Sequence, residues 1–584
     1  MSFNFSIGGG GGWGPNPGAG NNNNPWSAWQ PTNVPQGFES WGNPQFQQPA
    51  WGGPPQWGGQ SSGFSQGGFG GPWQNQGFNQ GGQGGPWQGQ NQGQNQGWGP
   101  WQNPNVNPSP PNPGWGNWGA RRRGSQDGGN GGQQNDVSGG SFSGKTYAIV
   151  VKNSTNQEWS SVAETLKAKY PQYAPKVYIY ESDVTEVVPR LKEDLPYYTC
   201  FIAGPVENTR EYLKTVHKIT RGLTPGPYYD TIWGILTGPD QNCTNRIAKI
   251  SDPLKIRRAI SNTSLNYDKI VEGTMYSESD EGQCNEKVCG NPKFVKGTCG
   301  ADLSEIFAYE LANKNNKKRP VDLIVSSAHA TEHNWQIGYK YNAGYFVHDG
   351  NNTLQALHIG GGRENIESSN PKVLVAAGNC LMGHVVQGGC MALSWMNSAN
   401  VAQMVGYTVE SWFGYGGWGI LKYFVDLGGM LNLSESFFAN MQSLIRLLNK
   451  PEKIRNIPNF EKGLQYDEYV MAFYGDPAWD ARIESPSEQN GTVPNKYVTE
   501  FEQVGPKSYR MKVTMSQDGD WDCEKGNDNW TQPGRPPIFI FPRRMRNARV
   551  VSGNIILTPL FAFFEVEGKV SAGTVYEAVF EEQY

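Results

Sequence analysis

Between residues 146 and 409, short apolar runs alternate with stretches of helical periodicity. Apolar runs that predict strands lie at 147–151, 177–180, 197–204, 231–236, 269–277, 321–327, 372–377 and 401–409. Helical patterns lie between them at 159–170, 209–220, from about 252, 302–313 and 391–397, and they dominate from 417 to about 473. Strands that alternate with helices in this way are typical of parallel βαβ units with right-handed crossovers. We therefore predict an α/β domain over 145–482, built as one large unit or two fused ones, with a mainly parallel sheet flanked by helices.

The pattern of apolar and polar residues changes after residue 482. A polar linker rich in Ser, Pro, Glu and Gly covers 483–495, and beyond it Tyr509, Met511, Val513 and Met515 alternate with polar residues. Further strands are expected at 555–566 and 575–580. Short strands separated by turn residues predict a small β-sandwich over 496–584.

Residues 1–144 follow neither pattern. The first 120 residues hold 12 of the 21 tryptophans, no leucine and a single charged residue, Glu39. A segment with so few branched apolar side chains cannot offset the entropy of ordering the backbone, about 1–2 kcal/mol per residue. We expect a disordered, low-complexity arm. Its regularly spaced indole rings suit weak self-association, and a passive tether is an equal alternative.

Composition excludes several classes of function. The 584 residues carry a net charge of −4, and Arg121-Arg122-Arg123 is the largest basic cluster, so we expect no nucleic-acid partner. No window approaches 18 consecutive apolar residues, so we expect no membrane span. The amino terminus lacks the basic and apolar regions of a secretory signal. These features predict a cytoplasmic protein or one exported by a non-classical route, and leave the compartment open.

Two of the predicted strands end in residues capable of nucleophilic chemistry. The strand 321–327 is followed by His329, and the strand 372–377 is followed by Cys380. Reactive groups of open parallel sheets lie beyond the carboxyl ends of the strands. If the two strands are neighbours, an imidazole meets a thiol, and it can accept the thiol proton and later protonate a leaving amine. The pair predicts acyl transfer, and small residues at Gly378 and Gly383 are expected to let a substrate backbone approach.

The segments that carry these two residues resemble the gingipain family of cysteine peptidases, in the caspase-like clan. The similar stretches are Asp322-Leu323-Ile324-Val325-Ser326-Ser327-Ala328-His329-Ala330 and Val373-Leu374-Val375-Ala376-Ala377-Gly378-Asn379-Cys380. Tyr474-Gly475-Asp476-Pro477-Ala478 resembles the segment that closes the family's catalytic domain before an immunoglobulin-like sandwich. The resemblance implies a cysteine endopeptidase acting on protein or peptide substrates, with no required cofactor and with structural calcium as an option.

Carried over position by position, the resemblance makes His329 the catalytic histidine and Cys380 the nucleophile. The oxyanion hole would consist of the backbone amides of Cys380 and Ala330. Ala330 stands where the family has Gly, which matters only if the position needs a positive φ. Glu278 matches a carboxylate that orients the histidine, although a solvated acid is an equally ordinary interpretation. Asp302 matches the acid that selects a basic residue before the cleaved bond, and the ordinary alternative is a helix first-turn acid.

A preference for basic residues would give Arg121, Arg122 and Arg123 a role as a processing site at which the arm is released. The alternative is a solvated charge run at the end of a linker. Cleavage of the wild-type chain and not of a Cys380→Ala chain would separate the two.

Two other functions compete with a cysteine peptidase. His329-Ala330-Thr331-Glu332-His333 fits the His-x-x-Glu-His pattern, in which two histidines on a helix bind zinc, although its flanks are not helical in sequence. His384, four residues after Cys380, is a second candidate base. The third function is non-enzymatic, an adhesion or assembly protein that uses the Trp-rich arm. Cys284, Cys289 and Cys299 form a separate cluster, which predicts one disulfide or free thiols rather than a metal site.

Overall fold

The structure is a computed structural model, and it describes residues 144–291, 293–314, 318–411, 416–450, 460–484, 494–521 and 535–583. The predicted arm and Arg121, Arg122 and Arg123 lie outside these ranges.

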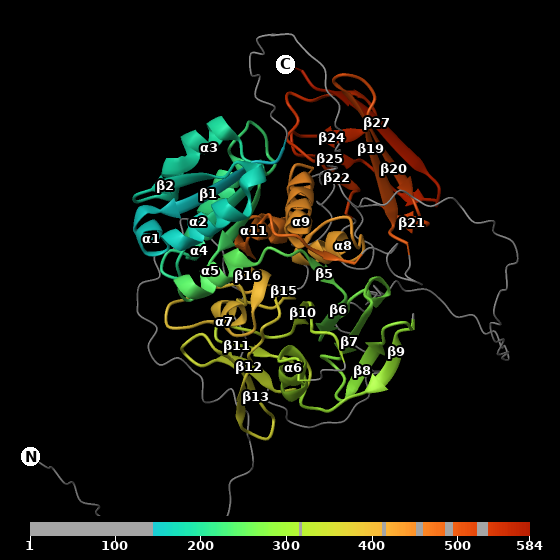
Figure 1. The fold of residues 1–584 in the computed structure, drawn as a ribbon. Coiled ribbons are helices and arrows are strands. Elements are labelled where there is room, and N and C mark those ends of the chain that lie inside the picture. The colour runs from blue at the N-terminus through green and yellow to red at the C-terminus, as the bar shows by residue number, and fades with distance from the viewer. Residues whose placement is uncertain are drawn as a thin grey trace, which may run out of the picture. The chain divides into compact units, whose positions relative to one another are not determined.

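A twelve-stranded sheet forms the centre of the α/β part (Figure 1). Its strand order is β2-β1-β3-β4-β17-β16-β15-β10-β6-β7-β8-β9. The strands are β1 (Tyr147–Lys152), β2 (Lys176–Tyr180), β3 (Tyr198–Ile202), β4 (Ile232–Leu236), β6 (Arg258–Ser261), β7 (Glu272–Tyr276), β8 (Gln283–Lys287), β9 (Val295–Thr298), β10 (Leu323–Ser327), β15 (Lys372–Gly378), β16 (Val401–Tyr407) and β17 (Met471–Gly475).

The sheet consists of two parallel sets that run in opposite directions. β2, β1, β3, β4 and β17 are parallel to one another, and so are β16, β15, β10, β6 and β7. The direction reverses at the antiparallel pair of β16 and β17, and the antiparallel β8 and β9 finish the far edge. The prediction of a mainly parallel sheet is therefore confirmed, and the two sets share one continuous sheet.

Helices flank this sheet (Figure 1). They are α1 (Asn153–Glu158), α2 (Ser160–Lys169), α3 (Val188–Asp194), α4 (Arg210–Arg221), α5 (Gln241–Lys249), α6 (Leu303–Leu311), α7 (Met391–Asn397), α8 (Gly419–Phe424), α9 (Leu433–Leu448) and α11 (Phe460–Val470). Short 3-10 turns lie at Pro171–Tyr173, Val184–Val187, Tyr267–Lys269 and Gly416–Trp418. α9 is buried on nearly every side, because it packs between the α/β sheet and the C-terminal strands.

Two local predictions are wrong, and one small sheet is not predicted at all. The helix expected from about residue 252 is instead β5 (Leu254–Ile256) followed by β6. Its periodicity misleads because the charged Arg258 is buried in the sheet, paired with Glu310 of α6. The helical stretch 417–473 ends in a strand, β17. The small antiparallel sheet of β11 (Asn334–Gln336), β12 (Tyr345–His348), β13 (Leu354–Leu357) and β14 (Arg363–Asn365) has no strong sequence signal.

The C-terminal part is a sandwich of antiparallel sheets, as expected. One sheet has the order β19-β20-β27-β23 and the other β22-β25-β24. Ring contacts fill the space between them, with Phe501 4.9 Å from Phe539 and Phe541 5.3 Å from Phe580 between ring centroids. The strands are β19 (Tyr497–Gln503), β20 (Ser508–Met515), β22 (Ile538–Ile540), β23 (Arg549–Ser552), β24 (Ile555–Leu557), β25 (Phe561–Phe564) and β27 (Val575–Glu581), with a separate pair β21 (Gly519–Asp520) and β26 (Lys569–Val570).

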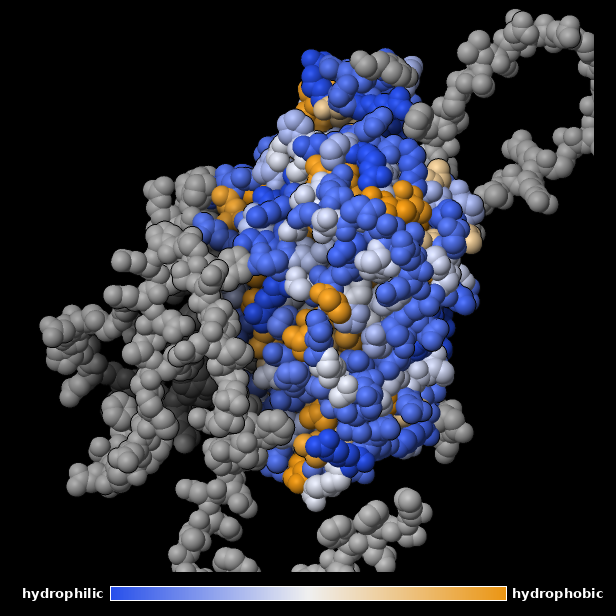
Figure 2. Space-filling model, turned by 90° about the vertical axis from the view of Figure 1, so that its left-hand side faces the viewer, coloured by the Kyte–Doolittle hydropathy of each residue, from blue (hydrophilic) through white to orange (hydrophobic). Residues whose placement is uncertain are grey.

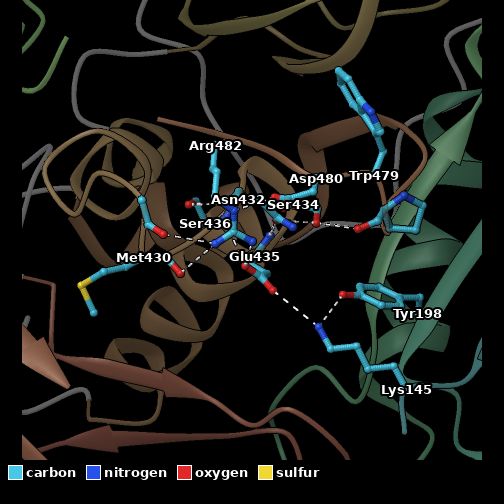
Figure 3. Close-up of polar contacts among 12 residues, drawn as sticks. Lys145, Tyr198, Met430, Asn432, Ser434, Glu435, Ser436, Trp479, Asp480 and Arg482 are labelled. Carbon is cyan, nitrogen blue, oxygen red and sulfur yellow. Dashed lines mark hydrogen bonds and ion pairs between the residues drawn. The ribbon is translucent and has the colours of Figure 1, made fainter. Parts of the chain in front are cut away.

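A half-buried polar cluster joins both ends of the α/β part at the start of α9 (Figure 3). Lys145 donates to the Tyr198 hydroxyl at 2.9 Å and lies 3.9 Å from the Glu435 carboxylate. Arg482 lies 3.8 Å from the same carboxylate and donates to Asp480 at 2.6 Å. One carboxylate thus holds residues at the beginning and at the end of this part of the chain. Burial alone would lower the pKa of Lys145, but charge interactions with Tyr197 and Glu435 raise it.

Hydrophobic residues on the face shown in Figure 2 form small separate patches in a mainly hydrophilic surface. Such scattered patches are normal for a folded protein. Among the residues that the structure describes, no helix is long and apolar enough to cross a membrane.

Candidate active site

The strands that carry His329 and Cys380 are direct neighbours. β10 and β15 pair in parallel, with Leu323 opposite Val373 and Ser327 opposite Gly378. His329 and Cys380 each follow two residues after that last pair. The structure therefore brings the ends of both strands to the same edge of the sheet, as their sequences predict.

Each of the two residues adjoins a left-handed backbone position. Ala328, directly before His329, has φ 78°, and Leu381, directly after Cys380, has φ 56°. This conformation is costly for residues with a β-carbon, roughly 1–3 kcal/mol, and persists only where the surroundings impose it. Strain of this kind clusters at functional sites.

Asn379 holds the two strand ends together. It is fully buried, and its side-chain amide donates to the Ala328 carbonyl at 2.9 Å. Its oxygen accepts a hydrogen bond from the Ser326 hydroxyl at 2.5 Å. This clamp explains why a larger polar residue precedes Cys380, because a smaller one would leave the strained Ala328 without support.

The Cys380 thiol is partly exposed and contacts the loop after β16. Its sulfur donates to the Ser411 carbonyl at 3.4 Å and accepts from the Ser411 amide at 3.3 Å. The Ser411 hydroxyl lies 3.8 Å from the sulfur. Ser411 thus fixes the thiol at the end of β15.

The His329 side chain is exposed and its ring stacks on Tyr339, with 5.1 Å between ring centroids. Within the part of the chain described, its ring makes no hydrogen bond to the Cys380 thiol. Proton transfer between the two requires the thiol and the imidazole to come into hydrogen-bond contact. Catalytic hydrogen bonds often close only when substrate is bound.

The two amides expected to form the oxyanion hole have no hydrogen-bond partner among the described residues. Ala330 forms an isolated antiparallel bridge with Trp335. The hydrogen bonds of this bridge come from the neighbouring residues: the Thr331 amide donates to the Asn334 carbonyl and the Gln336 amide to the His329 carbonyl, at 2.8 Å each. At such a position the amide points away from the partner strand. Ala330 is not among the residues with positive φ, so a β-carbon there costs nothing. Both amides are free to donate.

Glu278 lies buried beside the end of β10. Its backbone carbonyl accepts from the Tyr339 amide at 2.6 Å, and one of its carboxyl oxygens has no partner among the described residues. Burial raises the pKa of this carboxyl to about 7, opposed by hydrogen bonds from the Ser327 and Thr263 hydroxyls. The backbone carbonyl of Glu278 is linked to the His329 ring through Tyr339, whereas its carboxyl group bonds Ser327 and Thr263. It is not the solvated acid that an acidic run in sequence suggests.

Asp302 is the N-cap of α6. One carboxyl oxygen accepts from the Ser304 amide and hydroxyl, at 3.1 and 2.6 Å, and from the Glu305 amide at 3.3 Å. The other accepts from the Ile359 amide at 2.8 Å. Both oxygens hold local structure, and selection of a basic substrate residue by Asp302 stays a prediction.

The segment 329–333 is not a helix, which removes the premise of a zinc site. It is a tight turn between β10 and β11, in which the His333 ring pairs with His348 at 2.9 Å. No group of three or more His, Cys, Asp and Glu among the described residues could hold a metal ion. The pattern matched in sequence because two histidines happen to flank this turn.

His384, the second candidate base, lies against Arg210, with 3.1 Å between their nitrogens, and 4.0 Å from Glu332. Burial and the Arg210 cation lower its pKa to about 4. Neither histidine makes a hydrogen bond to the Cys380 thiol in the described structure. His329 follows the end of β10, the direct neighbour of β15, whereas the His384 ring contacts Arg210.

Gly378 and Gly383 serve packing rather than substrate approach. A β-carbon on Gly378 would lie 2.4 Å from the Trp418 ring and 2.7 Å from the Ser327 hydroxyl. A β-carbon on Gly383 would lie 2.6 Å from the Gly406 carbonyl. The expectation that these glycines clear space for a substrate is wrong.

No family model matches the chain, and no curated protein matches it. A solved structure described as "Structure of Protease" is 8% identical, with a TM-score of 0.33, and the match covers 64% of this chain and 85% of that one. A second, "Crystal structure of Drosophila Piwi", is 14% identical with a TM-score of 0.14 and covers 32% of this chain and 29% of that one. Likenesses of this size do not show a family.

Proposed function

We propose that the chain is a cysteine endopeptidase that uses Cys380 as nucleophile and His329 as general acid and base. One observation carries this proposal: neighbouring parallel strands deliver a thiol and an imidazole to one sheet edge in matching register. Left-handed residues beside both groups support it, and so do the Ala330 and Cys380 amides, which have no hydrogen-bond partner among the described residues.

The reaction begins when His329 accepts the Cys380 proton. The thiolate attacks the carbonyl carbon of the scissile peptide bond, and the resulting oxyanion accepts hydrogen bonds from the Ala330 and Cys380 amides. The imidazolium then gives its proton to the leaving amine, which departs and leaves a thioester on Cys380. His329 next takes a proton from water, the hydroxide attacks the thioester, and the imidazolium returns the proton to the sulfur.

Glu278 acts on this reaction as a positioning residue. Its backbone carbonyl fixes the Tyr339 amide, and Tyr339 supports one face of the His329 ring. A rigid support of this kind holds the imidazole in one orientation, which matters because misplacing a general base by 1 Å costs on the order of 100-fold in rate.

A covalent probe tests the proposal directly. A panel of peptidyl acyloxymethyl ketones, with basic, acidic and apolar residues before the reactive group, is applied to the full chain and to variants. We expect labelling at Cys380, none in Cys380→Ala, and labelling at least 100-fold slower in His329→Ala, in line with the loss of a general base. The relative labelling rates across the panel also test the expected preference for a basic residue before the reactive group.

The matched control is Cys289→Ser, because Cys289 is exposed and lies on the hairpin turn between β8 and β9. It should label at the wild-type rate. Labelling that persists in Cys380→Ala, or that is unchanged in His329→Ala, contradicts the proposed peptidase.

A further inference from the structure

Two cysteines that the site does not use lie side by side on the outer hairpin of the sheet. β8 and β9 are antiparallel, with Cys284 opposite Gly297. Cys299 follows two residues after Gly297 and so lies on the same face, diagonal to Cys284. The two thiols are near enough for each to shift the pKa of the other, and both are partly exposed.

The surroundings let these thiols come closer. Gly297 has no side chain, and a β-carbon there would lie 3.5 Å from the Cys284 sulfur, so the sulfur rests over an open position. β9 is the last strand of the sheet, and most of its residues are exposed. A disulfide requires the two sulfurs to come to about 2.05 Å from each other. An edge strand that packs on one side only can make this shift.

The hairpin closes the turn that carries Glu278. The Cys299 amide donates to the Gly282 carbonyl at 2.9 Å, and the Ser277 amide donates to the Gln283 carbonyl at 3.0 Å. Between these bonds lies the segment 277–282, which includes Glu278. Tyr341 adds a bond from its hydroxyl to the Ser277 carbonyl at 2.8 Å.

We propose that Cys284 and Cys299 are a reversible redox site, which a low-molecular-weight disulfide such as oxidised glutathione converts into a disulfide that fastens the turn 277–282. The proposal is independent of the peptidase reaction. Only one consequence rests on the proposed function, namely that fastening the turn which carries Glu278 affects the position of His329.

Cys284 is the attacking thiol of the pair. Burial raises the pKa of both thiols. Cys299 offsets part of this rise at Cys284 by stabilising its thiolate, whereas Cys284 adds to the rise at Cys299 and brings its pKa to about 12. The Cys284 thiolate attacks one sulfur of oxidised glutathione, forms a mixed disulfide and releases one glutathione. Cys299 then attacks the Cys284 sulfur, forms the internal disulfide and releases the second. Two thiols are oxidised, one external disulfide is reduced to two thiols, and the balance is complete.

Peptide mapping tests this cleanly, because trypsin separates the three cysteines of the region. Cys284 falls in 270–287, Cys289 in 288–293 and Cys299 in 297–314. The purified full chain is treated with oxidised glutathione, alkylated and digested without reduction. We expect a cross-linked 270–287 and 297–314 pair that reduction separates, and alkylated Cys289 or its glutathione adduct. Hydrogen exchange of the amides in 277–283 should slow on oxidation.

Two variants keep the test falsifiable without unfolding the hairpin. In Cys299→Ser, Cys284 should stop at the glutathione adduct and exchange in 277–283 should not slow. In Cys289→Ser, the Cys284–Cys299 cross-link should form as in the wild type. Separate glutathione adducts on both Cys284 and Cys299, or a cross-link from either to Cys289, overturn the proposal. These results do not depend on whether the peptidyl probes label Cys380.

Discussion

At the scale of single residues, Asn379 shows how the site is held. Its side chain spans the ends of β10 and β15 and supports Ala328 in a left-handed conformation. Asn379→Ala leaves the Ser326 hydroxyl and the Ala328 carbonyl without partners, and an unsatisfied buried polar group costs about 1–3 kcal/mol. We expect a loss of about 3 kcal/mol in the free energy of unfolding, measured by urea denaturation.

Ser326→Ala provides the comparison for Asn379→Ala. It removes one of the two hydrogen bonds and leaves the Ala328 carbonyl held, so the expected loss is about 1 kcal/mol. Probe labelling of Cys380 should fall strongly in Asn379→Ala and little in Ser326→Ala. Equal effects on labelling would show that the clamp on Ala328 is not what positions His329.

The buried Glu278 carboxyl predicts a dependence of stability on pH. Its pKa is raised to about 7 in the folded protein against 4.5 for an ordinary glutamate. Between these values the folded state binds more protons than the unfolded state, so its contribution to stability is present below pH 4.5 and is lost as the pH rises through 7. The loss amounts to about 3 kcal/mol at most, at 1.36 kcal/mol per pKa unit.

Glu278→Gln removes this titration and keeps the shape of the side chain. The difference in unfolding free energy between the variant and the wild type should therefore shift in favour of the variant from pH 5 to pH 8. Urea titrations at several pH values measure it. A difference that stays constant across this range would mean that Glu278 is ionised in the fold at pH 5.

At the scale of elements, what was predictable follows the strength of the pattern. Buried parallel strands such as β10 and β15 are continuous apolar runs, and their ends could be located to within two residues. The ends of β8 and β9 cannot be located in this way, because their residues are mainly polar and partly or fully exposed. The sequence of β5 and β6 suggests a helix because it contains the charged Arg258. Arg258 is buried in the sheet only because it pairs with Glu310, which lies far away in sequence.

The same limit applies to the candidate site. His329 and Cys380 could be found because they directly follow strong strand signals. Ser411 and Tyr339 could not, since they reach the thiol and the imidazole from loops whose course depends on the whole fold. Asn379 was visible in sequence only as a departure from a family pattern, and its clamp on Ala328 became clear from the structure alone.

Packing of the 3-10 turn Gly416–Trp418 on β15 gives a prediction at this scale. Gly378→Ala places a β-carbon 2.4 Å from the Trp418 ring, and overpacking of this kind costs about 1–3 kcal/mol. Gly360→Ala is the control, since a β-carbon there meets nothing within 4 Å and should change stability by less than about 0.5 kcal/mol. Denaturant midpoints compare the two. Equal midpoints would mean that Trp418 moves aside freely.

At the scale of the whole molecule, the sandwich and the α/β part are joined by buried polar contacts. Arg446 of α9 forms an ion pair with Glu565, with side chains 1% and 8% exposed, and Lys450 donates to the same carboxylate at 3.1 Å. The Tyr197 hydroxyl donates to the Phe541 carbonyl at 2.6 Å. Arg535, just before β22, donates to the Gly416 carbonyl at 2.9 Å. We therefore expect the two parts to unfold together.

The ion pair at Glu565 tests this coupling. Glu565→Gln removes the charge that pairs with the buried Arg446 cation, and removal of one partner of a buried pair costs about 3–5 kcal/mol. Glu577→Gln is the matched change in the same sandwich, where the pair with Arg510 is 4.0 Å apart and about half exposed, so it should cost less than about 1 kcal/mol. Calorimetry should show one transition in the wild type and in Glu577→Gln, and a lowered or divided transition in Glu565→Gln. Arg446 lies near the end of α9, and Lys145 and Arg482 contact Glu435 at the start of the same helix. If Glu565→Gln destabilised the sandwich alone, α9 would not couple the stability of the two parts.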